Sequence, residues 1–548
     1  MWWESATHCT IMEFLKPAWY HEVLLLGALS ALSTLRESPV QTIARYLLTV
    51  AVARHLAKVI YNIFIYPFYF SPLRHIPGPK DHHFLLGDLI NQARSGNPIE
   101  PYLSWTRKWP NEPFIKFTGF GNSDCLLINN LEAYKEIFQT KSYSFVKAQF
   151  NTRVIVQVTG TGMAFAEGDA HKSQRKLLAP QFALSNVKRA IPLFKSKGKE
   201  LIEHFHTRIK SQDGITDVSS AYGRVTLDIV AWFTLGIDLG STLSTSLFHE
   251  AYHKMFDPSA FGAFLMVMNA YIPGTRSLPF EENREFNACS EGVRSRLKEI
   301  IQQRVKEIDS GSIDVSDKPD LLTHMILESR AIGDPWSEAK ILENSMNVLV
   351  AGHETSATTL TWATHTFTLY PHIQERARKE VLDLLARHPD PDYMDLDSLH
   401  YIDNIIKETL RFYAPGVLAA REPVNDIDVC GTVLPKGTLC YLFPALVTRS
   451  IRIWGDDVDE FNPDRWDRLT GEATNPHAFA TFLVGPRQCI GKVFALLEIK
   501  VLLVEMLSNF KFEAAVDPKD ITLVNPSPVL RPQGGLKVKV LPLKKSEI

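Results

Sequence analysis

The chain has 548 residues, of which 45% are hydrophobic and 22% charged, so it is long and apolar enough to bury a large core. The formal net charge of −2 excludes the strongly basic balance of a nucleic-acid-binding protein. Six cysteines (Cys9, Cys125, Cys289, Cys430, Cys440 and Cys489) form no C-x-x-C pair and no zinc-ligand spacing, which is typical of a reduced, cytosol-facing protein.

The first 70 residues are more apolar than the rest. Val23 to Leu35 is an apolar segment, although it is shorter than the ~20 residues that cross a bilayer as a helix. Five basic residues follow it and a single lysine precedes it, so the positive-inside rule places the later chain in the cytosol. A second apolar stretch, Tyr46 to Phe70, contains Arg54 and Lys58, which favours a segment lying in the membrane interface over a second span. We expect residues 1–70 to form an uncleaved membrane anchor, and an ordinary buried helix is the alternative.

Residues 71–80 (SPLRHIPGPK) contain three prolines and one glycine. Proline fixes its own φ angle and has no N–H donor, so a segment this rich in proline is stiff and extended. We expect it to be a hinge between the anchor and one large body formed by residues 81–548.

Within that body, the hydrophobic pattern predicts a mainly α fold with a small β-sheet. Strand patterns are few: 114–120, 125–129, a hairpin from Ile427 through Pro435–Gly437 to Phe443, and 536–541. Helical periodicity covers 183–210, 281–308, 337–370, 402–413 and 491–510. Ser337 is a suitable N-cap and Pro371 ends the third of these helices, so it should run ~50 Å through the core.

The segment Phe482 to Gly491 (FLVGPRQCIG) contains one cysteine between two glycines. Gly485 and Gly491 allow a close approach that a β-carbon would block, and Arg487 can supply a fixed cation. Cys489 lies just before a helical run, where the helix dipole lowers a thiol pKa. A nucleophilic role would need a nearby histidine base and a zinc site would need more cysteines, whereas an axial ligand to haem iron needs only one.

The pattern F-x-x-G-x-R-x-C-x-G in this segment resembles the haem-binding loop of the cytochromes P-450, the haem-thiolate monooxygenases. The resemblance implies the fold of that family and a haem b cofactor with the Cys489 thiolate as axial ligand. It also implies that Phe482, Gly485, Arg487 and Gly491 contribute to the cofactor site.

The segment AGHETS (351–356) lies in the middle of the long helix. A H-E-x-x-H zinc site is excluded, because the second histidine position is Ala357. Gly352 and the alanine before it leave a thin patch of helix where a diatomic ligand could fit. Glu354 and Thr355 place an acid and a hydroxyl beside that patch, which suits delivery of protons to dioxygen. The segment resembles the oxygen-activation motif of the family, although in isolation it would favour a contact between two helices through small residues, with a capping threonine.

The segment ETLR contains Glu408 and Arg411, which are three residues apart and therefore share a helix face. Such a pair is usually a solvated surface pair. The resemblance implies instead a buried pair that is joined by Arg465 and has a structural role.

The segment 168–182 (GDAHKSQRKLLAPQF) carries His171 and Arg175 four residues apart. They resemble the pair that binds a haem propionate, although most family members have tryptophan where this chain has His171. Arg421 is a further propionate candidate and could equally be a surface charge.

The resemblance also implies the reaction and its partners. A thiolate ligand favours cleavage of the O–O bond of O2, so that one oxygen atom is inserted into the substrate. The chain lacks a complete dinucleotide fingerprint and a flavin-type domain, so a separate NADPH-cytochrome reductase should supply the electrons. Basic residues that could dock it, or could merely be solvated, are Lys172, Arg175, Lys176, Lys188 and Arg189.

The anchor, the hinge and the 167–176 segment resemble fungal endoplasmic-reticulum members, many of which act in secondary metabolism. The catalytic body should then face the cytosol and take a lipophilic substrate from membrane lipid. By family position, substrate contacts fall in 145–162, the loop 255–273, 348–352, 417–419 and 525–529. A haem-thiolate isomerase or dehydratase and a non-catalytic haem sensor or carrier remain as alternatives, and the acid and hydroxyl at 354 and 355 argue against the isomerase.

Overall fold

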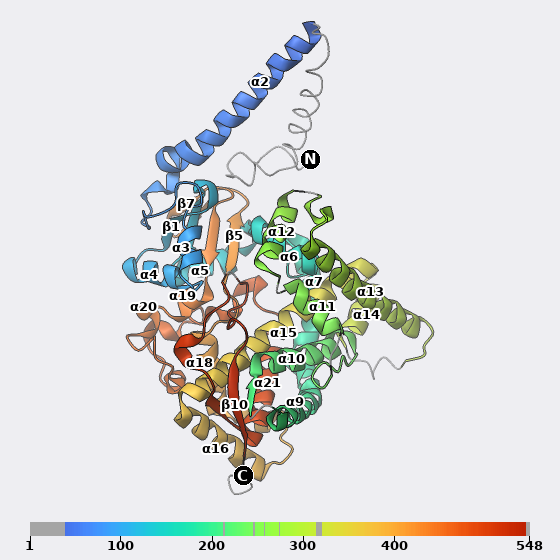
Figure 1. Ribbon diagram of the computed structural model, residues 1–548. Coiled ribbons are helices and arrows are strands. Elements are labelled where there is room, and N and C mark those ends of the chain that lie inside the picture. Colours follow the sequence, from blue (N-terminus) through green and yellow to red (C-terminus); the bar gives the residue numbers. More distant parts are fainter. Residues whose placement is uncertain are drawn as a thin grey trace.

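The computed structural model describes residues 39–211, 214–244, 247–256, 258–272, 274–313, 320–525 and 527–543. The chain forms a mostly helical body with small sheets, from which α2 (Pro39–Ile60) projects (Figure 1). The predicted fold class is therefore confirmed. The apolar segment predicted at Val23–Leu35 lies outside the described residues.

The other helices are α3 (Leu89–Arg94), α4 (Glu100–Lys108), α5 (Leu131–Lys135), α6 (Gln149–Thr159), α7 (Gly168–Leu178), α8 (Leu184–Val187), α9 (Ile191–Ser211), α10 (Val218–Leu235), α11 (Leu247–Phe256), α12 (Ala260–Tyr271), α13 (Glu281–Asp309), α14 (Leu321–Ala331), α15 (Glu338–Leu369), α16 (Pro371–Arg387), α17 (Tyr393–Asp397), α18 (His400–Phe412), α19 (Pro444–Thr448), α20 (Ile451–Trp454) and α21 (Lys492–Asn509). The strands are β1 (Phe114–Thr118), β2 (Asp124–Ile128), β3 (Phe145–Lys147), β4 (Ile215–Asp217), β5 (Ala419–Pro423), β6 (Ile427–Val429), β7 (Thr432–Leu434), β8 (Leu439–Leu442), β9 (Phe510–Ala514) and β10 (Lys537–Pro542).

The long helix predicted from Ser337 to Tyr370 is present as α15. The Ser337 hydroxyl accepts the Lys340 N–H at 3.2 Å and caps the first turn, and Pro371 begins the next helix. Most of α15 is buried, so it crosses the core as expected. The predicted helices at 281–308, 402–413 and 491–510 are also confirmed, as α13, α18 and α21.

The helix predicted from Ala183 to Lys210 is interrupted. α8 and a 3-10 turn at Lys188–Ala190 precede α9, which starts at Ile191. Pro192 lies in the first turn of α9, where its missing N–H leaves no hydrogen bond unmade. Deeper inside a continuous helix the same proline would remove a bond and clash with the preceding turn, so the helix begins beside it.

The largest sheet has five strands in the order β1-β2-β8-β5-β3. Only the β2–β8 pair is parallel among its described pairs. Leu126 and Ile128 of β2 are buried in one apolar cluster, whereas Cys125 and Leu127 are buried in another. Since a strand alternates its side chains between two faces, this sheet is covered on both sides. β3 is an edge strand and β5 is its neighbour, and both carry basic residues of the candidate site.

The predicted hairpin from Ile427 to Phe443 is wrong in its turn. β6 and β7 pair around Cys430 and Gly431, whose φ angles are 51° and 76°. Two consecutive residues with positive φ make a tight turn whose twist matches that of paired strands. The chain then passes Pro435–Gly437, and β8 pairs with β2 and β5 instead.

The described part of the anchor, from Pro39 to Phe70, is helical. α2 continues into a π-helical segment, η1 (Tyr61–Phe70), and Ile43–Phe70 is long and apolar enough to cross a membrane by length and composition. We expected this stretch to lie in the interface because of its charges. Pro67 lies inside η1 and has no N–H to donate, and the Asn122 side chain of the body donates to the Ile63 carbonyl at 3.0 Å.

The expected hinge is docked on the body. Ser71 caps a 3-10 turn, η2 (Pro72–His75), and the Pro77 carbonyl accepts the Lys116 N–H of β1 at 2.8 Å. A β-carbon at Gly78 would lie 1.7 Å from the Lys116 carbonyl oxygen, so only glycine allows this close approach.

A buried ionic network joins α18 to the segment after α20. The Arg411 guanidinium donates two hydrogen bonds of 2.9 Å to Glu408, and both side chains are completely buried. Arg465 donates to the same carboxylate at 2.9 Å, as the resemblance implied, and the Trp466 indole donates at 3.0 Å. The remaining Arg411 donors reach backbone carbonyls. Arg465 also pairs with Asp457 at 2.9 Å, so the two guanidinium groups of the network face two carboxylates.

Replacing Glu408 with Gln should lower the free energy of unfolding by about 3 to 5 kcal/mol, because the charge that compensates Arg411 and Arg465 is lost in the interior. The matched control is Glu299→Gln, which breaks an exposed pair of the same spacing with Arg296 and should cost less than about 1 kcal/mol. Urea unfolding of the purified protein measures both values. Equal losses in the two variants would contradict the importance of burial.

Candidate functional site

The loop around Cys489 turns back on itself before α21. The Cys489 N–H donates to the Phe482 carbonyl at 2.8 Å, which closes the loop. Leu483 has φ 56° and ψ −173°, a conformation that is costly for any residue with a β-carbon, and Gly485 also has positive φ. Such strain persists only where surrounding structure enforces it, and it concentrates at functional sites.

The two glycines of this loop have different roles. A β-carbon at Gly485 would lie 2.4 Å from the Phe138 carbonyl oxygen, so this glycine allows the loop to pack on the η4 turn (Glu136–Thr140). It does not provide space for a cofactor, contrary to our expectation. Gly491 has an ordinary conformation, and a β-carbon there would meet only the Cys489 sulfur, at 4.0 Å. A larger side chain at Gly491 would therefore occupy space beside the sulfur.

The Cys489 thiol is exposed, and its pKa differs from our expectation. Surrounding protein atoms desolvate the sulfur and raise the pKa of Cys489, and this effect outweighs the Gly491 N–H and the charges of Arg175 and Lys492. In the protein alone the helix start is thus insufficient to favour the thiolate. A bound metal ion removes the proton of a coordinating thiol outright, so the residue still suits a metal ligand.

Arg487 is buried and is held by the protein. Its guanidinium donates to the carbonyls of Ser142 and Phe145, at 3.1 and 2.8 Å. It also donates to the carboxylate of Glu167. The Nε atom is buried and has no hydrogen-bond partner among the described residues.

His171 lies beside Tyr143, whose hydroxyl is 3.2 Å from its Nδ1. Burial first, and then the charges of Lys147 and Arg487, lower the pKa of His171 to about 4. The imidazole is therefore neutral at physiological pH and can act as a hydrogen-bond donor.

Arg175 and Arg421 complete a basic group of residues. Arg175 donates to the Gln488 carbonyl at 2.7 Å, next to Cys489. Arg421 is buried rather than on the surface, and burial lowers its pKa to about 10. Lys147 lies opposite Arg421 in the β3–β5 pair, and burial lowers its pKa to about 8.

We call Lys147, His171, Arg175, Arg421 and Arg487 the cationic cluster. Four of its members are cations at neutral pH, and Glu167 is the carboxylate that pairs with Lys147 and Arg487. Positive charge held out of water is costly unless a counter-charge is present. The cluster therefore suits a ligand with more than one carboxylate, and together with one thiol this donor set fits the haem that the sequence implies.

Sequence reasoning missed Lys147, Glu167 and Tyr143. They belong to segments far from the cysteine loop in the sequence. Glu167 and Tyr143 contact Arg487 of that loop, and Lys147 is placed by the pairing of β3 with β5. Residues 145–162 were assigned to the substrate as one stretch, and the basic residue at its start gave no separate signal.

The oxygen-activation motif lies in the middle of α15, where Ala351 is exposed and Ser356 is buried. The Thr355 hydroxyl donates to the Ala351 carbonyl at 2.7 Å. Gly352, however, faces α10: a β-carbon there would lie 2.6 Å from Cγ2 of Val230. Our expectation that Gly352 leaves room for a diatomic ligand is therefore wrong, because its role is to allow α10 to pack closely on α15.

A buried acid joins this motif to the helix that follows Cys489. The Ser356 hydroxyl donates to Glu498 Oε2 at 2.7 Å, and both residues are buried. Burial raises the pKa of Glu498 to about 8. An acid on the apolar helix α21 gave no signal in the sequence, because its partner lies 142 residues away.

The expected substrate-contact segments meet in pairs. Gln157 of α6 donates to the Met266 carbonyl of α12 at 2.9 Å and accepts from Asn269 at 2.8 Å. Most of 255–273 is thus the helix α12 rather than a loop. The Val417 N–H donates to the Pro528 carbonyl at 3.2 Å, which joins segment 417–419 to segment 525–529.

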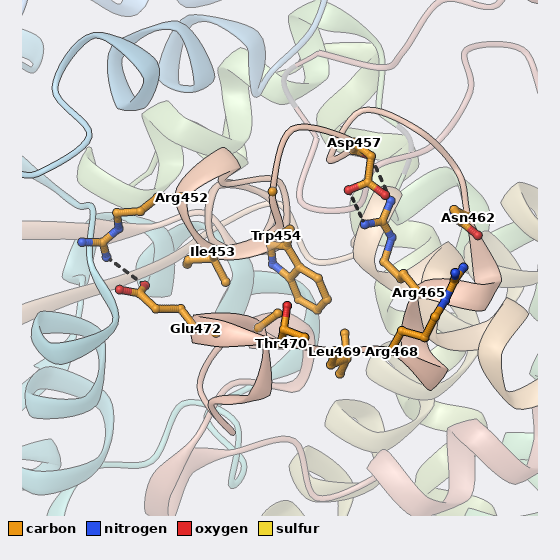
Figure 2. Close-up of a pocket in the computed structure, with 13 residues that line it drawn as sticks. Arg452, Ile453, Trp454, Asp457, Asn462, Arg465, Arg468, Leu469, Thr470 and Glu472 are labelled. Atoms are coloured by element: carbon orange, nitrogen blue, oxygen red, sulfur yellow. Dashed lines mark hydrogen bonds and ion pairs between the residues drawn. The ribbon is translucent and has the colours of Figure 1, made fainter.

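A separate pocket of about 520 Å³ lies beside the Glu408 network (Figure 2). Its charged residues are paired with one another, Arg465 with Asp457 at 2.9 Å and Arg452 with Glu472 at 3.4 Å. None of the predicted cofactor or catalytic residues lines it.

Comparison with known proteins gives one family. The family model for Cytochrome P-450 matches residues 77–540. The chain is 29% identical to the cytochrome P-450 monooxygenase sphH of Aspergillus fumigatus, over 89% of this chain and 92% of the relative. It is 28% identical to the cytochrome P-450 monooxygenase FUM15 of Gibberella moniliformis, over 89% and 91%. A third relative, ALT8 of Alternaria alternata, is 27% identical over 87% and 91%.

Gly352→Ala should destabilise the protein by about 1 to 3 kcal/mol, because the added methyl group overpacks the α10–α15 contact. Val230→Ala removes the clashing atoms, so the double variant should recover at least about half of that loss. Urea unfolding of the single and double variants measures the coupling. Simply additive losses would show that the added methyl group does not contact Val230.

The raised pKa of Glu498 makes stability depend on pH. The folded chain keeps a proton up to about pH 8 that an unfolded carboxyl group releases near its ordinary value of ~4.3. The stabilisation is therefore fully present below ~pH 4 and is lost as the pH rises through about 8. Between about pH 5 and 8 the wild-type protein should lose at least ~2 kcal/mol more than Glu498→Gln. Parallel urea-unfolding curves across that range would contradict this assignment.

Proposed function

The chain belongs to the cytochrome P-450 family and is a haem-thiolate monooxygenase, and from this premise we propose that it oxidises a lipophilic organic substrate in a fungal secondary-metabolite pathway. One oxygen atom of O2 enters the substrate by hydroxylation, epoxidation or a multistep oxidation. The cofactor is haem b, and a separate NADPH-cytochrome reductase supplies the electrons.

The cationic cluster beside Cys489 is the observation that carries this proposal. Cys489 would bind the iron through its sulfur, and coordination would offset the desolvation by surrounding protein atoms that raises the pKa of this thiol. Arg175, which bonds the Gln488 carbonyl beside Cys489, and neutral His171 would hold a propionate, and Arg487 and Arg421 would compensate its charge. When bound, the haem supplies O2 activation strong enough to oxidise an unactivated C–H bond.

Glu354 and Thr355 have the catalytic role of moving protons. The Thr355 hydroxyl donates to the Ala351 carbonyl, which leaves its oxygen free to accept a proton from solvent or from an acid. To pass a proton outward, the hydroxyl rotates away from that carbonyl. Glu354, the residue before it, is the acid that replenishes the proton.

Residues 1–70 form the anchor in the endoplasmic-reticulum membrane, residues 71–80 the hinge, and residues 81–548 the catalytic domain facing the cytosol. The length and apolar composition of Ile43–Phe70 support the anchor. Lys172, Lys176 and Arg189 are exposed and suit an acidic reductase surface. Arg175 is half-buried and donates to the Gln488 carbonyl, so it is not part of the proposed docking surface for the reductase.

The deciding experiment is the carbon monoxide difference spectrum of the reduced protein. The wild-type protein should give the Soret band of a thiolate-ligated haem, and Cys489→Ser should lose it. Cys289→Ser, which removes a half-buried cysteine elsewhere, is the matched control and should keep it. A thiolate-type band in Cys489→Ser would overturn the ligand assignment.

A second measurement separates a monooxygenase from a carrier or an isomerase. With reductase, NADPH and a panel of lipophilic compounds, the wild-type protein should consume NADPH and form oxygenated product. Thr355→Ala should keep the difference spectrum and lose about tenfold or more of the product rate, with the electrons appearing as hydrogen peroxide. Normal product yield in Thr355→Ala would contradict the proton-transfer role.

A further inference from the structure

A hydrogen bond in the interior connects the two helices that carry the two halves of the proposed site. Ser356 of α15 directly follows Glu354 and Thr355. Glu498 belongs to the second turn of α21, which begins three residues after Cys489. The 2.7 Å bond from Ser356 Oγ to Glu498 Oε2 joins these helices where both are completely buried.

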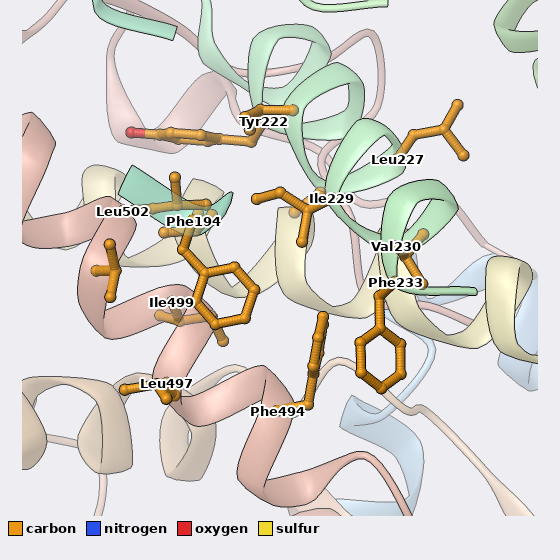
Figure 3. Close-up of a cluster of buried hydrophobic side chains, with 14 of the residues drawn as sticks. Phe194, Tyr222, Leu227, Ile229, Val230, Phe233, Phe494, Leu497, Ile499 and Leu502 are labelled. Atoms are coloured by element: carbon orange, nitrogen blue, oxygen red, sulfur yellow. The ribbon is translucent and has the colours of Figure 1, made fainter. Parts of the chain in front are cut away.

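One turn before Glu498, α21 is held by apolar packing. Figure 3 shows Phe494 of α21 next to Phe233 of α10, and their ring centroids are 4.5 Å apart. Phe194 of α9 also packs against Phe494, at 5.2 Å. Apolar contacts are not directional, so they hold a helix against its neighbours without fixing its position along its axis. A short hydrogen bond fixes both distance and direction.

A buried glutamic acid at position 498 lowers the stability of the fold, so stability alone does not explain its presence. Its Oε1 is buried and has no hydrogen-bond partner within the described part of the chain. Burial raises the pKa of the acid, so at neutral pH it is largely uncharged and bonds Ser356 as a neutral group. A leucine of similar volume would fill the same space without leaving a polar atom unsatisfied.

We infer that Glu498 is a positioning residue: its hydrogen bond with Ser356 sets where the Glu354–Thr355 pair stands relative to Cys489. The inference rests on the proposed function, because that function assigns proton transfer to Glu354 and Thr355 and iron binding to Cys489. Glu498 acts through Ser356 and does not itself take part in the reaction. Losing the bond should let α15 and α21 shift against each other, so that the site adopts several arrangements instead of one.

Carbon monoxide bound to the reduced protein is the probe, because its stretching frequency responds both to the sulfur ligand and to polar groups beside it. In Glu498→Leu and Ser356→Ala the infrared C–O band should broaden about twofold or split. Glu498→Gln keeps an acceptor for the Ser356 hydroxyl and should restore the wild-type width. Thr355→Ala should shift the C–O frequency. In the Glu498→Leu background this shift should be at least halved, because the Glu354–Thr355 pair is no longer held at a fixed position relative to Cys489.

Two matched controls test for a merely structural effect. Thr361→Val removes a buried hydroxyl of α15 that bonds only its own helix, at the Ala357 carbonyl, within the described contacts. Lys500→Met removes another buried ionisable group of α21. Both should lower the unfolding midpoint while leaving the width of the C–O band unchanged.

The outcomes separate the two proposals. A C–O band of wild-type width in both Glu498→Leu and Ser356→Ala, with an intact thiolate-type spectrum, would overturn this inference alone. Failure of the wild-type protein to give that spectrum would overturn the proposed function and this inference with it. If Glu498→Leu does not fold, two milder variants test the inference. Ser356→Ala removes the hydrogen bond and should broaden the C–O band, and Glu498→Gln keeps an acceptor and should not.

Discussion

The structure depends on how ionisable groups are buried in its apolar helical body. At three sites the hydrogen bonds and charges of such groups are satisfied to different extents. At Glu408 the carboxylate is satisfied by Arg411, Arg465 and Trp466, so the network holds α18 to the following segment and has no capacity left for a ligand. The cationic cluster is satisfied only in part, with Glu167 against four cations. Buried positive charge in excess requires negative charge from a ligand, so the degree of satisfaction distinguishes a structural site from a binding site.

Glu498 stands between these two cases. One of its oxygens accepts from Ser356 and the other is unsatisfied in the described structure. The carboxyl group avoids a buried charge by remaining protonated. It therefore neither needs a cation nor attracts an anion. A neutral buried acid can therefore connect two helices without changing the charge of the site beside it, which an ion pair at the same place would do.

Local sequence signals predicted those parts of the fold that depend on neighbouring residues. Ser337 and Pro371 fixed the ends of α15 because capping and proline act within one turn. The hairpin turn was misplaced because Pro435–Gly437 is also a turn sequence, and the choice between it and Cys430–Gly431 depends on β8 finding partners in β2 and β5. Lys147 was missed for the same reason, since only the pairing of β3 with β5 brings it to Arg421. The thiol pKa was predicted in the wrong direction because the helix dipole is a local effect, whereas desolvation comes from the whole fold around the sulfur.

The motif glycines show why recognising a motif is not the same as explaining it. Gly352 and Gly485 occupy positions that we interpreted as space for a ligand, yet their missing β-carbons face Val230 and Phe138. Each glycine brings a ligand-bearing or proton-bearing segment into close contact with a neighbouring element, α10 in one case and η4 in the other. The same principle operates at the anchor, where Asn122 takes the carbonyl that Pro67 leaves without a donor. In all three places a backbone feature of one segment is completed by another segment, so the geometry of the site follows from contacts between segments that are far apart in the sequence.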